Sequence, residues 1–294
     1  MKFIHSFWSK PFSDASTNNN WNLRYHGGFP NAFLFYCSWT YSCLSIQKYY
    51  PNLHLVTDEE GMYIFRDVLK LPYKSFSTDL EKIDHYNPGL WALGKLHAYK
   101  IQDEPFCHLD GDVFLFGPVL DDVLHGKVFC QSFDEDTDQY AEIHPYIHKN
   151  FKNVPEAYNA SLSDGIKLIN AGILGGNDLS VFQEYTANAF ELIDNNHDVL
   201  EQINVGLLNL YYEQFLFSNM VRRQNIEVAS LFSEDGLEPN FAAFHQIPIH
   251  SRYVHLISHL KRSTEFMEQV VTRLQFEFPD YYERVSNHFK VRSL

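Results

Sequence analysis

The 294-residue chain has few basic side chains: 23 Lys and Arg stand against 37 Asp and Glu, for a formal net charge of −14. Proteins that bind nucleic acid need clustered Lys and Arg to neutralise backbone phosphates. The charge balance therefore argues against nucleic acid as a partner. Any ligand that carries phosphate would need a local cation, either a metal ion or a placed lysine.

Cysteine is also scarce, with four residues and no Cys-x-x-Cys pair. Neither a zinc site nor a disulfide framework is therefore predicted. No apolar run is long enough to span a bilayer, and no charged-then-apolar leader precedes the first apolar residues. We expect no transmembrane segment and a cytoplasmic location, since that compartment keeps thiols reduced.

Apolar and aromatic residues are abundant, at 45% and 16% of the chain, which is enough for one large core. The first 116 residues alternate predicted strands with predicted helices, an order that favours an α/β sheet. In open sheets of this class, ligands bind beyond the carboxyl ends of the strands. Asp58 and Asp112 both follow such ends. We therefore expect chemistry rather than core at these aspartates.

The most informative stretch is 106–116, where apolar and aromatic residues flank Asp110 and Asp112. It predicts a short buried strand, in which residues two apart share a face. Two carboxylates so close repel each other and are costly to bury alone. A divalent cation would resolve that conflict, and carboxylates suit Mg²⁺ and Mn²⁺, which also bind substrate phosphates. A lone Asp-x-Asp more often marks a solvated turn; a matching His and Lys downstream favour the metal site.

Three further stretches carry signals. Residues 166–177 predict an apolar strand broken by small residues, where glycine allows close approach of a ligand or another strand. Glu213 and Gln214 are polar neighbours on a predicted helix, which is unusual unless they face a site. Residues 253–261 place a histidine six positions before a lysine.

Two other segments have plainer interpretations. The acidic residues of 131–142 predict a solvated, flexible loop, with a lid over an acceptor site as the alternative. Residues 264–276 and 281–289 predict two amphipathic helices separated by Pro279. Contact of these helices with a membrane surface through Lys290 and Arg292 has little support, because no basic run accompanies them.

Taken in order, four motifs resemble the GT-A nucleotide-sugar glycosyltransferases, nearest to the retaining family of glycogenin and the bacterial lipopolysaccharide galactosyltransferases. That family carries Asp-x-Asp, Asn-Ala-Gly, an acidic-Gln pair and His-x-x-Gly-x-x-Lys. The matching residues are Leu109-Asp110-Gly111-Asp112-Val113, Asn170-Ala171-Gly172-Ile173, Glu213-Gln214 and His255-Leu256-Ile257-Ser258-His259-Leu260-Lys261. Glu213 and Ser258 replace the usual Asp and Gly, while order and spacing are kept.

The resemblance implies a fold and its division. We expect the Rossmann-like GT-A fold of the α/β class, with a mostly parallel central sheet flanked by helices and with C-terminal helices. A GT-A domain over 1–261 would comprise a nucleotide-sugar-binding half, 1–116, and an acceptor-side half, 117–261. Residues 262–294 would form a helical cap.

The resemblance also implies the site of a hexosyltransferase. Asp110, Asp112 and His255 would hold Mn²⁺ or Mg²⁺, bridging the two phosphates of a nucleotide-sugar donor such as a UDP-hexose. Lys261 would be a second cation on the leaving diphosphate. Lys95, on a preceding helix, would reach the donor phosphate or the sugar hydroxyls.

The remaining implied residues concern the sugar and the acceptor. Asn170, Ala171 and Gly172 would line that side, with Gln214 near the anomeric carbon. Because helix neighbours point about 100° apart, we expect only Gln214 to face the donor, which predicts retention; Glu213 as general base would instead mean inversion. The acceptor is left open among a glycan, a lipid-linked sugar, a peptide and a small molecule.

Two other classes of function use the same residues. A metal-dependent nucleotidyltransferase or phosphohydrolase would want a glycine-rich phosphate loop or more carboxylates near the metal, and the sequence shows neither. A non-catalytic nucleotide-sugar binding module is the second, and the intact Asp110, Asp112 and His255 argue against it.

Overall fold

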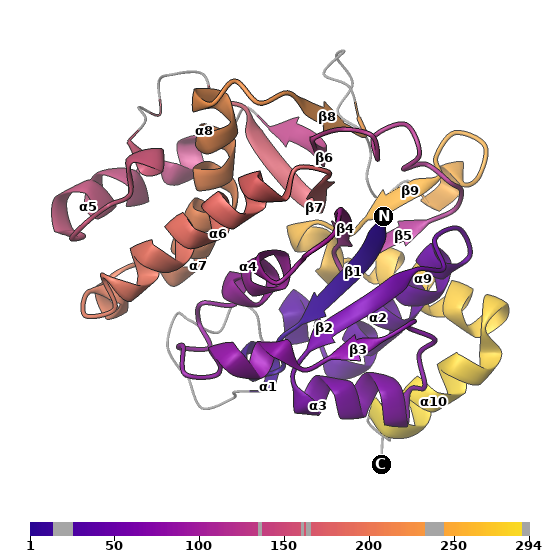
Figure 1. Cartoon of the computed structure of the whole chain (residues 1–294). Coiled ribbons are helices and arrows are strands. Elements are labelled where there is room, and N and C mark those ends of the chain that lie inside the picture. The colour runs from indigo at the N-terminus through magenta and orange to yellow at the C-terminus, as the bar shows by residue number, and fades with distance from the viewer. Residues whose placement is uncertain (14–25, 135–136, 160–161, 163–165, 233–243, 290–294) are drawn as a thin grey trace.

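A seven-stranded sheet in the order β3-β2-β1-β4-β7-β6-β8 runs through the molecule (Figure 1). The computed structural model describes residues 1–13, 26–134, 137–159, 162, 166–232 and 244–289. The strands of this sheet are β1 Lys2–Phe7, β2 Leu53–Thr57, β3 Phe76–Ser77, β4 Phe106–Leu109, β6 Val128–Asp134, β7 Leu168–Gly176 and β8 Val228–Ser230. A separate antiparallel pair is formed by β5 Val113–Leu115 and β9 Tyr253–His255.

The predicted mostly parallel sheet is confirmed. Strands β3, β2, β1 and β4 run parallel, and β8 runs parallel to β6. Only β7 is reversed among the described strands of this sheet, since it pairs antiparallel with β4 and with β6. All four residues of β4 are buried, as expected where helices cover both faces of a sheet.

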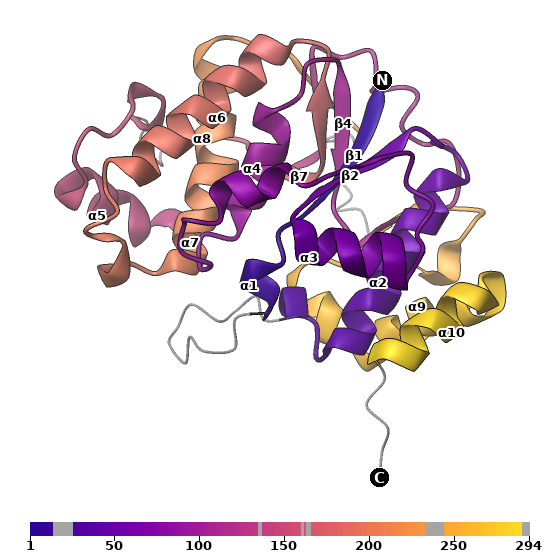
Figure 2. The same ribbon diagram turned by 60° about the horizontal axis from the view of Figure 1, so that its bottom comes forward.

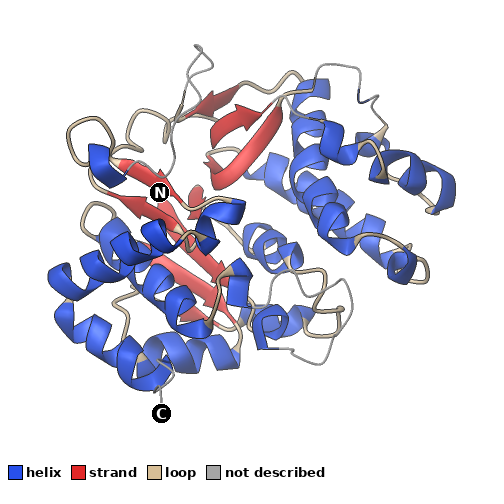
Figure 3. Cartoon of the chain, turned by 180° about the vertical axis from the view of Figure 1, so that it is seen from behind, coloured by secondary structure: helices blue, strands red, loops and turns tan. Residues whose placement is uncertain are grey.

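Helices cover both faces of the sheet, which gives three layers (Figures 2 and 3). Helices α2, α9 and α10 lie on one face, and α4, α6 and α8 lie on the other (Figure 2). The α-helices are α1 Lys10–Ser13, α2 Ala32–Gln47, α3 Glu59–Met62, α4 Ala92–Lys100, α5 Ile143–Asn150, α6 Leu179–Asp194, α7 Val205–Leu210, α8 Leu216–Arg223, α9 Thr264–Glu277 and α10 Pro279–Phe289. Two π-helical turns cover Tyr63–Val68 and Tyr211–Phe215.

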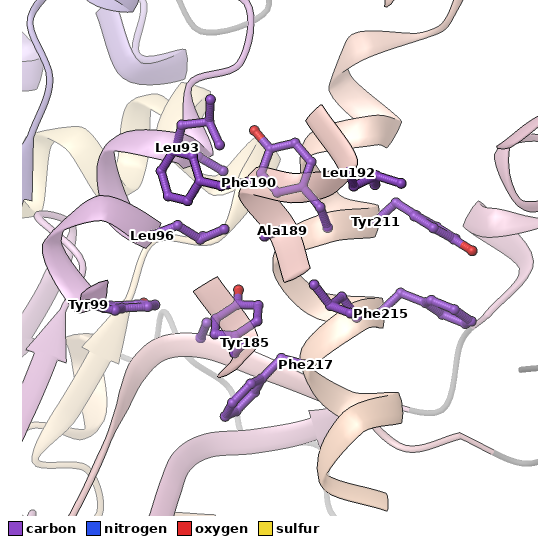
Figure 4. Packing of buried hydrophobic residues seen from close by; sticks show 14 of the residues in the cluster. Leu93, Leu96, Tyr99, Tyr185, Ala189, Phe190, Leu192, Tyr211, Phe215 and Phe217 are labelled. Carbon is purple, nitrogen blue, oxygen red and sulfur yellow. The ribbon is translucent and has the colours of Figure 1, made fainter. Parts of the chain in front are cut away.

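The core on the α4 side fixes the position of α4 (Figure 4). Leu96 and Tyr99 of α4 pack with Tyr185 of α6, and the Tyr185 ring lies 4.7 Å from that of Phe217 in α8. All four side chains are buried. Each such side chain contributes about 1.5–3 kcal/mol by leaving water. The packing therefore holds the helix that carries Lys95.

Helix α2 is buried on all sides over most of its length. Every residue from Phe35 to Ile46 is buried, because α9 and α10 cover the face that the sheet leaves open (Figure 2). Tyr36 stacks on Phe289 of α10, with ring centroids 3.9 Å apart. The two predicted C-terminal helices are present; Pro279 begins α10 rather than separating the pair, a position that suits its fixed φ and missing N–H.

Three local predictions are wrong. The strand predicted over 106–116 ends at Leu109 and resumes at Val113, so Asp110 and Asp112 lie in a turn. Residues 131–134, predicted as loop, belong to β6. Asp58 is a structural residue: its buried carboxylate caps α3 through the Gly61 N–H and accepts the Ser9 N–H.

No helix among the described residues is both long and apolar enough to cross a membrane. Lys290 and Arg292 lie outside the described residues. The four cysteines are buried free thiols.

We expect the fold to lose stability in mild acid. Burial lowers the pKa of His5 to about 3 and that of His144 to about 4, whereas unfolded histidine titrates near pH 6.5. Below that pH the unfolded chain binds protons that the folded chain excludes, so their contribution is complete above pH 6.5 and falls as the pH drops toward the folded values. Urea midpoints measured at about pH 7.5 and about pH 5.5 should show a decrease.

His144→Gln gives the matched comparison. His144 Nδ1 lies 2.7 Å from the Tyr211 hydroxyl, and glutamine keeps a hydrogen-bonding group there without a proton to gain. The variant should show a smaller difference between the two midpoints. An unchanged difference would mean that the pKa of His144 is the same in the folded and the unfolded protein.

Candidate active site

The two aspartates lie in a tight turn between β4 and β5. The Val113 N–H donates to the Asp110 carbonyl at 3.1 Å and closes the turn. A Cβ on Gly111 would lie 2.2 Å from the ring of Trp39 in α2, so only glycine fits between the aspartates. The turn therefore rests directly on the buried helix. The carboxylates converge because of this turn, and not because of strand alternation.

His255 joins the aspartates through strand pairing. Residue 255 of β9 is paired with Val113 of β5, directly after the turn. Its Nε2 lies 3.5 Å from Oδ1 of Asp112. One ligand atom from each of Asp110, Asp112 and His255 lies within 4.8 Å of the others. Two carboxylates and one imidazole are a donor set that suits Mn²⁺ or Mg²⁺, and the residues present fit such an ion.

Two lysines balance the carboxylates. Lys261 Nζ lies 2.7 Å from Oδ2 of Asp112. Lys95 Nζ lies 2.8 Å from Asp110, 2.9 Å from Glu213 and 2.8 Å from the Ala171 carbonyl oxygen. Three carboxylates thus face two ammonium groups, which leaves one negative charge when His255 is neutral.

The pKa shifts follow from this arrangement. Burial raises the pKa of Asp112, but Lys261 and His255 outweigh burial and hold it well below the usual range. Burial lowers the pKa of Lys95, but Asp110 and Glu213 outweigh burial and raise it above its ordinary value. Asp112 is therefore a carboxylate and Lys95 an ammonium at neutral pH.

A bulge in β7 connects these groups. Between the pairs Cys130–Leu174 and Ser132–Asn170, β6 has one residue while β7 has three, 171–173. The Ala171 carbonyl accepts from Lys95, and the Gly172 carbonyl accepts the Asp110 N–H at 2.9 Å. The glycine-broken strand predicted over 166–177 is thus a bulged strand that binds the first aspartate and the buried lysine.

A cavity of about 740 Å³ opens in front of the cluster, within the range of ligand pockets. Asn170 and Ala171 line it; Gly172 does not, because it lies behind His255. Both Glu213 and Gln214 also line the cavity, and which of them faces the donor stays a prediction.

The side chains of Glu213 and Gln214 lie in different environments. Glu213 is 5% exposed and paired with Lys95. Gln214 is partly exposed, and its Oε1 accepts a hydrogen bond from the Tyr140 hydroxyl at 3.1 Å. Both residues lie in the π-helical turn Tyr211–Phe215, a type of turn found often at functional sites.

The rest of the cavity wall comes from both halves of the chain. From the first half come Ser6 and Phe7 at the end of β1 together with Trp91, and from the second half come Leu207 and Leu210. Asp134 and Gln139 also line it, so part of the segment predicted as a solvated loop faces the site.

The sequence reasoning missed Gln131 and the hydroxyl of Tyr253. Gln131 is fully buried and contacts His255 through its side-chain oxygen, which also accepts from Tyr253. A lone amide inside the otherwise apolar run of 128–131 was the available signal, because buried amides need hydrogen-bonding partners.

The chain was compared with known proteins. Residues 1–288 match the family described as "Family of unknown function (DUF6734)". No curated protein matches.

Among the solved structures, the galactosyltransferase LgtC with donor and acceptor sugar analogues is similar over 87% of this chain and 86% of its own, at 13% identity and a TM-score of 0.40. An active-site mutant of LgtC is similar over 100% of this chain and 98% of its own, at 12% identity and a TM-score of 0.44. The glycosyltransferase GlyE of Streptococcus pneumoniae is similar over 97% of this chain and 62% of its own, at 11% identity and a TM-score of 0.43.

Proposed function

The chain belongs to the family of unknown function DUF6734, and we propose that it is a metal-dependent glycosyltransferase. It transfers a hexose from a nucleotide diphosphate donor, a UDP-sugar, to an acceptor glycan, lipid-linked sugar, peptide or small molecule. One observation carries the proposal: Asp110, Asp112 and His255 converge in the wall of a 740 Å³ cavity, with Lys261 beside them.

The cluster has the charge that a diphosphate donor needs. A divalent ion held by Asp110, Asp112 and His255 supplies Lewis-acid stabilisation of the leaving diphosphate. Lys261 adds a mobile ammonium at the same place, since its ion pair with Asp112 can be exchanged for a phosphate oxygen. Lys95 is held by three oxygen atoms, which use its three N–H donors. Its role is therefore to orient Asp110 and Glu213, and it would reach a donor phosphate or sugar hydroxyl only by exchanging one of these bonds.

The two sides of the cavity suggest where the substrates bind. We propose that the donor binds against the half formed by 1–116 and the acceptor against the half formed by 117–261, with 262–294 as the helical cap. Asn170, Ala171, Glu213 and Gln214 then line the sugar between them. A cytoplasmic location belongs to the same proposal, because the four buried thiols suit a reducing compartment.

A panel of nucleotide sugars, with candidate acceptors and Mn²⁺ or Mg²⁺, tests the activity. We expect metal-dependent binding of UDP by calorimetry and transfer of the sugar to an acceptor. Release of nucleoside monophosphate or phosphate without sugar transfer would instead indicate a nucleotidyltransferase or phosphohydrolase. Absence of metal-dependent nucleotide binding would favour the non-catalytic module.

The stereochemistry gives a separate prediction. Gln214 is partly exposed in the cavity, whereas Glu213 is buried and bound to Lys95; we therefore expect Glu213 to orient Lys95 and Gln214 to face the anomeric carbon. Transfer from a UDP-α-sugar should yield an α linkage by NMR. Gln214→Ala should lower turnover more than Glu213→Gln does.

Tyr140→Phe is the control, because it removes only the hydroxyl that donates to Gln214; it should lower turnover less than Gln214→Ala. A β linkage together with an inactive Glu213→Gln variant would make Glu213 the general base of an inverting enzyme.

A further inference from the structure

The imidazole of His255 contacts a buried amide on the side away from Asp112. His255 Nδ1 lies 2.7 Å from Oε1 of Gln131, and the Tyr253 hydroxyl donates to the same oxygen at 2.5 Å. An amide oxygen can only accept hydrogen bonds. His255 Nδ1 must therefore carry the proton. In the neutral imidazole, the lone pair is then left on Nε2, the nitrogen that lies 3.5 Å from Oδ1 of Asp112.

The backbone of β7 is shaped to allow this contact. A Cβ on Gly172 would lie 2.2 Å from Oε1 of Gln131 and 2.5 Å from Nδ1 of His255. Gly172 is in the bulge where three residues of β7 oppose the single residue Gln131 of β6. Three strands far apart in the sequence thus meet at one hydrogen bond. Residue 172 must be glycine, because a Cβ at this position would push the side chains of Gln131 and His255 apart.

The amide is costly where it is. Gln131 is fully buried, and its Nε2 has no hydrogen-bond partner among the described residues. An unpaired buried donor destabilises a fold, and an apolar side chain of the same size would avoid that cost. Only the oxygen of the amide has hydrogen-bonding partners among the described residues, namely His255 and Tyr253.

We infer that Gln131 is a positioning residue that holds His255 in the tautomer protonated on Nδ1, so that Nε2 is available to a divalent cation beside Asp110 and Asp112. The inference rests on the metal site of the proposed function and names a residue that acts through a ligand. A histidine that binds a metal ion commonly donates its other ring N–H to an oxygen that fixes its orientation. The Tyr253 hydroxyl supports Gln131 by binding the same oxygen.

The opposite orientation of the amide makes the opposite prediction. With oxygen and nitrogen exchanged, Gln131 would donate to Nδ1 and place the proton of His255 on Nε2. That tautomer cannot bind a cation through Nε2. The protonation of the two ring nitrogens therefore decides the question, and it can be read without metal or substrate.

The first experiment is ¹⁵N NMR of histidine-labelled full-length protein without metal, at a pH where His255 is neutral. The signals of His255 are assigned by their loss in His255→Asn. We expect the Nδ1–H tautomer in the unchanged protein and a shift toward the Nε2–H tautomer in Gln131→Met. Gln131→Glu keeps an accepting oxygen and should retain the Nδ1–H tautomer.

The matched control is Gln102→Met. Gln102 is also a buried glutamine, but its side chain bonds only the Ala98 carbonyl within its own helix region. This variant should leave the His255 tautomer unchanged although it alters a core amide. An Nε2–H tautomer in the unchanged protein, or an Nδ1–H tautomer that persists in Gln131→Met, would overturn the inference.

The second experiment measures binding of Mn²⁺ alone by electron paramagnetic resonance. Loss of a partner of this kind weakens metal binding about 10–100-fold, and we expect that for Gln131→Met. Tyr253→Phe should weaken it less and keeps the fold available for test if Gln131→Met fails to fold. Equal affinities in all these variants would count against the positioning role.

The two proposals fail in different ways. Mn²⁺ binding without any sugar transfer would end the proposed function and leave the tautomer result intact. The reverse outcome, transfer activity with an Nε2–H tautomer, would end the role of Gln131 and leave the function intact.

Discussion

Asp112→Ala is expected to abolish sugar transfer and Mn²⁺-dependent binding of UDP while the protein stays folded. Asp112 is 8% exposed and lies next to both His255 and Lys261, so in the proposed site it joins the metal ligands to the ammonium of Lys261. Its loss removes a metal ligand and leaves Lys261 unopposed beside the site. Calorimetry with UDP and Mn²⁺, alongside a circular dichroism melt, separates loss of binding from loss of fold.

Asp121→Ala is the matched control. Asp121 also binds a neighbouring side chain, the hydroxyl of Tyr50, but it lies outside the cavity. This variant should retain full metal-dependent binding. Near-full transfer by Asp112→Ala in the presence of a chelator would show that no metal ion is needed.

Lys261→Ala is expected to lower turnover by about 10²–10³-fold, equivalent to about 2.7–4 kcal/mol of transition-state stabilisation. The ammonium matters most as negative charge develops on the leaving diphosphate, so acceptor KM should change little. The same substitution relieves Asp112 of its ion pair. Binding of Mn²⁺ alone should therefore be retained, which sets this variant apart from Asp112→Ala.

Lys152→Ala tests whether loss of any paired lysine has the same effect. Lys152 forms an ion pair of 2.8 Å with Asp198 on the surface, away from the cavity. Its loss should leave turnover within a factor of two, because exposed pairs contribute about 0–1 kcal/mol. Unchanged turnover in Lys261→Ala would reduce that residue to a solvent-facing lysine.

Local patterns predicted the strands and helices well where burial alone decides them. The alternation of strands and helices over the first 116 residues is present in the sequence, and Asn31 begins α2 as a cap whose side chain accepts the Leu34 N–H. The π-helical turn at Tyr211–Phe215 has no such signal. It places Glu213 and Gln214 in the wall of the same cavity, and the expectation that only Gln214 faces the donor stays a prediction.

The sequence predicts which residues form the candidate site, but not the turn and the bulge that bring them together. The motif residues Asp110, Asp112 and His255 do converge, because the order of motifs reflects which strand ends meet. The sequence predicts strand at Gly111 and gives no sign of the turn, because the clash that requires glycine comes from Trp39, a residue far away in sequence. The role of Gly172 was hidden for the same reason: its neighbours Gln131 and His255 come from other strands.

The pairing of β5 with β9 has a consequence for how the protein is made. Asp110 and Asp112 leave the ribosome long before His255 and Lys261, which reach them only when β9 adds to β5. A nascent or truncated chain that ends before residue 253 thus carries the paired carboxylates without the histidine and without the mobile lysine. In the proposed function, a chain can therefore capture a donor only after translation has passed Lys261, and a stop codon before that residue yields a protein without this lysine.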